Sequence, residues 1–139
     1  MSQSFPPIIR LLREDPRYRL PAYIFVREAL DYAHRELGLG SRRPVAPEEE
    51  PPPEAHLTGQ QLCEAIRQYA LNQYGYLAKL VLNSWGIHTT SDIGEIVYNL
   101  IAINVMRKSD SDRREDFDGV YDFDRVFVQE FQITVPRRV

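Results

Sequence analysis

The sequence predicts a mainly α-helical single domain of about five helices, with a small β element near the C-terminus. Apolar residues recur at spacings of three and four along several stretches, which is the period of a buried helical face. Proline, glycine, serine and threonine stand where those stretches begin and end. The chain has 139 residues, 43% of them apolar and 27% charged, and this composition suits one globular domain.

Residues 1–40 are a predicted N-terminal arm of two helices. Pro6 and Pro7 suit the first turn of a short helix, which ends at Asp15 because a residue before proline avoids the helical region. A second helix runs from Pro21 to about residue 37 and stops at glycine. The arm is too small to fold alone, so its apolar stripe must pack on the rest of the chain or on a partner. That stripe consists of Tyr23, Val26, Leu30, Ala33 and Leu37, widened by Phe25 and Ala29.

Residues 41–56 combine prolines and glutamates with almost nothing apolar, and we predict a disordered linker there. A helical core follows over residues 57–135. Thr58 and Gln61 have the spacing of a capping box, and the helix they begin ends near Gly75. This helix is expected to bury Leu62, Ala65, Ile66, Tyr69 and Ala70. After a bend or break at Gly75, a further helix is expected to contain Leu77, Leu80, Val81 and Trp85 and to end before Gly86.

The last predicted helix is capped by Ser91 or Asp92 and frays near Met106. With the helix before it, it forms a helix-turn-helix pair, followed by an acidic loop at residues 109–124. Residues 121–131 fit either a half-buried strand or a short helix capped by Asp122, and residues 132–135 fit a short strand. With such strands the C-terminal part is winged-helix-like. The buried stripe of the last helix is Ile93, Ile96, Val97, Leu100 and Ile101.

Six phrases of the sequence resemble a small family of conserved hypothetical proteins from planctomycete and verrucomicrobial bacteria. The resemblance spans nearly the whole chain except the linker. That family has no assigned activity, so the resemblance implies no substrate, cofactor or site residue. The phrases are LREDPRY (12–18), AYIFVREALDY (22–32), LTGQQL (57–62), LNSWGI (82–87), DIGEIVYNLI (92–101) and SDSDRREDFDGVYDFD (109–124).

The acidic loop is the first candidate for chemistry, because oxygen-rich loops suit Ca²⁺ or Mg²⁺. The candidate ligands are Asp110, Asp112, Asp116 and Asp118. The spacing fails the EF-hand pattern, and arginines lie among the acids, so a salt-bridged loop is the favoured interpretation. Phe117 and Phe123 can anchor this loop in the core while the acids before them cap turns.

Other catalytic patterns are weaker still. Ser84, His88 and Asp92 are residue types of a hydrolytic set, but there is no nucleophile elbow and capping explains them better. Cys63 has no cysteine or histidine at metal spacing and is expected to be a small core residue. We therefore name no catalytic residue and no cofactor, and favour a protein that is not an enzyme.

Nucleic-acid binding is disfavoured. The helix that begins near Asp92 would be the recognition helix of a winged helix, and its acids Asp92 and Glu95 oppose phosphate. Net charge is −3, and the sequence has no dense basic stripe. The alternative would use arginines of the N-terminal arm, which are Arg10, Arg13, Arg17, Arg19 and Arg27.

The preferred hypothesis is a non-enzymatic cytoplasmic protein-interaction or scaffold module that forms a homodimer or binds another protein. The absence of a secretory signal, of a membrane-spanning apolar run and of a second cysteine favours a reducing cytoplasm without membrane contact. The predicted interaction residues are Tyr23, Val26 and Leu30 of the apolar stripe with Arg10, Arg13 and Arg17.

Overall fold

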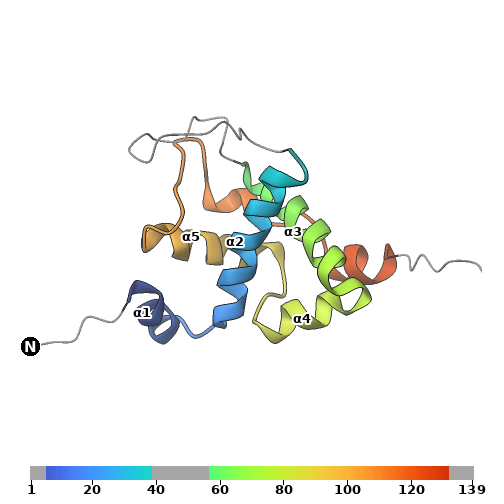
Figure 1. Ribbon diagram of the computed structural model, residues 1–139, viewed down its shortest axis with the longest axis horizontal. Coiled ribbons are helices and arrows are strands. Elements are labelled where there is room, and N and C mark those ends of the chain that lie inside the picture. The colour runs from blue at the N-terminus through green and yellow to red at the C-terminus, as the bar shows by residue number, and fades with distance from the viewer. Residues whose placement is uncertain (1–5, 39–56, 132–139) are drawn as a thin grey trace, which may run out of the picture.

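The computed structural model describes residues 6–38 and 57–131, and every regular element in these two stretches is helical (Figure 1). The mainly α prediction is confirmed. None of the helices described is both long and apolar enough to cross a bilayer. The α-helices are α1 (Pro7–Glu14), α2 (Leu20–Arg35), α3 (Gly59–Tyr74), α4 (Ala78–Ser84) and α5 (Thr90–Ala102). Shorter turns are η2 (Gly75–Leu77) and η3 (Arg114–Phe117), both 3-10, and the π-helical η4 (Arg125–Gln129).

Helix α2 lies at the centre of the fold and packs against both α3 and α5 (Figure 1). Pro21 stands in its first turn, where a missing amide hydrogen costs nothing. Its inward face is almost completely covered, so the N-terminal arm is built into the core. The buried residues of α2 are Ala22, Tyr23, Phe25, Val26, Ala29 and Ala33.

Helix α3 begins with the predicted capping box. The Gln61 amide donates to the Thr58 hydroxyl at 3.0 Å, and the Thr58 amide donates to the Gln61 side chain at 2.9 Å. The helix ends at Tyr74, where Gly75 takes a positive φ of 54° that L-residues rarely adopt. Both predicted boundaries of this helix are therefore confirmed.

The further helix predicted after Gly75 is confirmed as α4, and only part of its apolar residues is buried. Leu77 and Leu80 are 46% and 67% exposed, whereas Val81 and Trp85 are half-buried. Ala78 and Leu82, which are four residues apart, are buried instead. The cause is the turn at Gly75, because a 3-10 turn winds three residues per turn and does not continue the phase of α3.

Helix α5 starts before the predicted cap. Thr89 is the N-cap, and its hydroxyl accepts a hydrogen bond from the Asp92 amide at 3.3 Å while the Asp92 carboxylate accepts from the Thr89 amide at 3.2 Å. Asp92 thus closes a capping box at the third helical position and is not itself the cap. The helix stops at Ala102, short of the predicted Met106, and Asn104 follows in the left-handed region with φ 63°. The predicted stripe is correct, with Ile93, Ile96, Val97 and Leu100 buried and Ile101 half-buried.

Residues 121–131 form a turn and the π-helical η4, so the strand alternative is wrong there and the short helix is right. Asp122 caps the turn by accepting from the Arg125 amide at 3.1 Å. Phe123 and Phe127 are both buried, with ring centroids 5.0 Å apart. A spacing of four places two side chains on one face in a helix and in a strand alike, which explains the ambiguity of the pattern. The described residues contain no strand, so the wing of the predicted winged-helix-like arrangement is not found among them.

The acidic loop is held on the core by Phe117, which is 5% exposed. Phe117 packs against Gly59 on α3 and Gly94 on α5, where no side chain occupies the space beside the helix backbone. A Cβ atom on Gly94 would lie 2.7 Å from the Phe117 Cβ, and one on Gly59 would lie 2.9 Å from the Asp116 Cβ. The predicted linker at residues 41–56 and the predicted strand at residues 132–135 lie outside the described residues.

Candidate functional site

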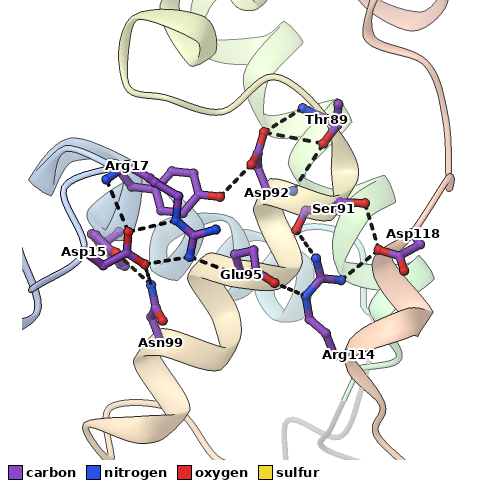
Figure 2. A network of polar contacts seen from close by, with 11 residues as sticks. Asp15, Arg17, Thr89, Ser91, Asp92, Glu95, Asn99, Arg114 and Asp118 are labelled. Atoms are coloured by element: carbon purple, nitrogen blue, oxygen red, sulfur yellow. Dashed lines mark hydrogen bonds and ion pairs between the residues drawn. The ribbon is translucent and has the colours of Figure 1, made fainter.

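A network of polar contacts joins three distant parts of the chain on one face of α5 (Figure 2). Arg17 binds Asp15 at 2.7 Å and Glu95 at 3.0 Å. The other Glu95 oxygen is bound by Arg114, which also reaches Asp118 at 2.9 Å. Asp15 and Arg17 follow α1, Glu95 lies on α5, and Arg114 begins η3. Three of the sequence phrases noted above therefore meet here.

The same network extends to the two ends of the α5 face (Figure 2). The Tyr18 hydroxyl donates to the Asp92 carboxylate at 2.6 Å. The Asn99 amide donates to Asp15 at 3.0 Å and to the Tyr23 hydroxyl at 3.1 Å. Because Tyr18 and Tyr23 are both buried, these bonds hold the segment between α1 and α2 on α5.

The electrostatics of the network indicate a structural role. Hydrogen bonds from Arg17 hold the pKa of Asp15 well below its usual value, and those from Arg114 lower the pKa of Glu95. Burial, followed by the hydrogen bond to Asp92, raises the pKa of the Tyr18 hydroxyl. At neutral pH Asp15 and Glu95 are ionised and paired with arginine, and the Tyr18 phenol keeps its proton. Asp15, Glu95 and Asp118 each face an arginine, while Asp92 accepts hydrogen bonds from Tyr18 and the Thr89 amide, so the network joins α5 to the segments packed around it.

Three of the four candidate metal ligands accept hydrogen bonds from the protein, two of them within the loop and the third also from α5. The Asp112 carboxylate accepts from the Ser109 amide at 2.8 Å, and Asp116 accepts from the Arg113 amide at 3.1 Å. Asp118 accepts from the Ser91 hydroxyl at 2.8 Å as well as from Arg114, and Asp110 is exposed. Within the described ranges, no group of three or more His, Cys, Asp and Glu side chains is placed to share a metal ion.

The hydrolytic residue types are not assembled either. The Ser84 hydroxyl donates back to the Val81 carbonyl at 2.6 Å, while Asp92 is held by Tyr18 and the α5 cap. Burial raises the pKa of the Cys63 thiol to about 12, so this cysteine stays protonated inside the core. None of these residues is presented as a nucleophile.

An open apolar groove lies between α1, α2 and the segment that follows α5. Its volume is about 620 Å³. Leu20 and Ile24 on α2 are 40% and 48% exposed, and Val105 is 39% exposed. We call it the α1–α2 groove, and its apolar lining includes Ile8, Leu20, Ile24, Leu100 and Val105.

The rim of the α1–α2 groove is charged with both signs. Arg27, Glu28, Asp31 and Arg35 line it from α2. Arg35 is paired with Asp31 at 2.7 Å, and Glu28 accepts a hydrogen bond from the Tyr69 hydroxyl at 3.4 Å. Arg27 and Asp31 also line a second hollow of about 400 Å³. An apolar floor with a charged rim is the usual form of a surface that binds protein.

The predicted interaction residues occupy two different environments. Tyr23 and Val26 are 1% and 0% exposed, so their side chains contact the rest of the core. Leu30 is half-buried. On the basic side, Arg10 and Arg13 are exposed on α1, and Arg17 is held in the polar network.

Sequence reasoning missed Leu20 and Ile24. The sequence contained a signal for these two residues, because the apolar residues of α2 extend around more of the helix than the predicted stripe covers. Comparison of the chain with protein families, with curated proteins and with solved structures found no match.

Proposed function

We propose that this protein is a non-enzymatic protein-interaction module and that the α1–α2 groove is its binding surface. The observation that carries the proposal is the exposure of Leu20, Ile24 and Val105 around one concave surface. Large apolar side chains scattered singly over a surface need no explanation, but a group of them around a groove marks a contact site.

The energetics favour a protein partner. Full burial of a leucine or isoleucine is worth about 1.5–3 kcal/mol, so side chains left nearly half exposed retain roughly 1 kcal/mol each. Several such contributions together are needed to overcome the entropy cost of association. A groove beside α2 suits an amphipathic helix, which would place its own apolar face against Leu20 and Ile24.

The other hypotheses receive less support. The start of α5, which would read DNA in a winged helix, has its acids Asp92 and Glu95 engaged with Tyr18, Arg17 and Arg114. The acids of the loop make turns and ion pairs. A cytoplasmic location remains part of the proposal and is supported by the buried free thiol of Cys63.

A photoreactive residue in place of Ile24 tests this function, with one in place of the exposed Asn72 on α3 as the control. Irradiation of the purified protein and of cells that produce it should yield a protein adduct at position 24 and not at position 72. The adduct should disappear when Leu20→Glu is added, because a charge in the groove opposes apolar contact. If position 24 yields no adduct with this chain or another, the proposed function is wrong.

A further inference from the structure

Helix α1 is attached to the molecule by few side chains. Of its eight residues only Leu11 is buried, while Ile8 and Leu12 are half-buried and the others are exposed. The larger contacts between elements of the described fold join α2 with α3 and α5 and do not include α1, which lies at the edge of the molecule (Figure 1). An isolated helix of this length is marginal in water, so α1 keeps its form only while it is packed on the core.

The segment that follows α1, residues 15–19, is by contrast firmly attached. The polar network binds Asp15 and Arg17 to α5, and the Arg19 amide donates to the Trp85 carbonyl at 3.1 Å. Asp15 is also the residue at which α1 ends, with a non-helical φ of −128° and ψ of 88°. A displacement of α1 therefore pivots at Asp15 and leaves α2 in place.

The α1–α2 groove depends on the position of α1. Ile8 of α1 lines the groove together with Leu20 and Ile24 of α2. Leu11 is not among the lining residues, so the residue that holds α1 on the core is separate from the one that contributes to the groove. Without α1 in place, the groove loses the wall that Ile8 provides, and its concave shape is lost.

We infer that α1 is a movable wall whose docking on the core switches the α1–α2 groove between a form that binds protein and a form that does not. This inference rests on the proposed function and concerns the regulation of that groove. Elements with few buried contacts open locally at a lower free energy than the core, so α1 detaches while α2, α3 and α5 keep their fold. A partner selects the docked form, and by linkage the bound partner holds α1 in place.

Hydrogen exchange of the full chain, followed by mass spectrometry of its peptides, tests the opening of α1. In the wild type, the protection of α1 amides against exchange should be at least about tenfold lower than that of α2 amides. Leu11→Ala should lower the protection of α1 at least about tenfold further and change α2 less, because it removes the buried side chain of α1. Leu82→Ala, a buried change on α4, is the matched control and should lower the protection of α2 more than that of α1.

The photoreactive residue at position 24 tests whether α1 controls the groove. Its adduct yield should fall in Leu11→Ala in proportion to the fraction of molecules in which α1 is docked. Arg10→Pro should have the same effect, because proline at this exposed position breaks α1 without a change in the core. The yield should be retained in Leu82→Ala, and also in Leu11→Met, which keeps a side chain of similar volume under α1.

Two results overturn the inference alone. One is a set of α1 amides that exchange only together with those of α2, at the rate of global unfolding. The other is an adduct yield at position 24 that stays the same or rises when Leu11→Ala or Arg10→Pro has released α1, and the groove then keeps its proposed function. Absence of any adduct when α1 is intact overturns the proposed function, and the inference falls with it.

Discussion

Replacing Gly94 by alanine should loosen the acidic loop from the helices. Gly94 lies in the middle of α5 and faces Phe117. A Cβ atom there would lie 2.7 Å from the Phe117 Cβ, 2.9 Å from the Phe117 Cγ and 2.8 Å from a terminal nitrogen of Arg114. Arg114 can move its guanidinium, but the backbone of η3 carries the Phe117 Cβ, so that segment must shift outward.

The size of the effect follows from two opposing contributions. Alanine in place of glycine inside a helix normally stabilises by about 1 kcal/mol. Overpacking a filled site costs about 1–3 kcal/mol, and the upper end applies here because two of the close contacts are to a buried aromatic residue. The net expectation is a loss of about 2 kcal/mol in the free energy of unfolding, or roughly 7 °C in melting temperature for a chain of this size.

Urea unfolding followed by circular dichroism measures this difference. Asn72→Ala is the matched control, because residue 72 is exposed on α3 and gains helix propensity without meeting a neighbour. The control should be stabilised by about 0.5 kcal/mol, while Gly94→Ala is destabilised. A Gly94→Ala protein as stable as the wild type, or more stable, would refute the close packing of Phe117 on α5.

Three further predictions concern single contacts. The lowered pKa of Asp15 stabilises the folded protein above the unfolded pKa of about 4, and this contribution is lost as the pH falls. Arg17→Met should therefore flatten the decline in the free energy of unfolding between pH 7 and pH 3. Parallel declines in the variant and the wild type would contradict this. Thr89→Ala removes the α5 cap and should cost about 1 kcal/mol in urea unfolding, and no loss would show that the cap is dispensable. Leu82→Ala should cost about 2–5 kcal/mol and Leu80→Ala less than about 0.5 kcal/mol, and the reverse ranking would contradict the burial of Leu82.

The candidate surfaces show the limit of pattern reasoning. The apolar stripe of α2 was identified correctly, and its strongest members, Tyr23 and Val26, were assigned to a partner as well as to the core. Both side chains are buried in the core, because α3 and α5 pack on that face of α2. What remains for a partner is the weaker apolar edge at Leu20 and Ile24, which becomes a groove only when α1 and Val105 lie beside it.

The sequence by itself determined the helices whose signals are local. Pro7 and Pro21 near helix starts, the capping box of Thr58 and the stripe of α5 depend on residues within one or two turns, so they can be read without the fold. The α5 cap was misplaced by only two or three residues, since Thr89, Ser91 and Asp92 are all good capping residues.

Only the tertiary structure decided which faces meet. The phase of α4 depends on the turn at Gly75, and the form of residues 121–131 depends on where Phe123 and Phe127 find a buried place. Ion pairs such as Arg17 with Glu95 join residues far apart in the chain. Local hydrogen bonds and periodicity specify an element, whereas burial is a property of two elements together, and no stretch of sequence contains that information alone.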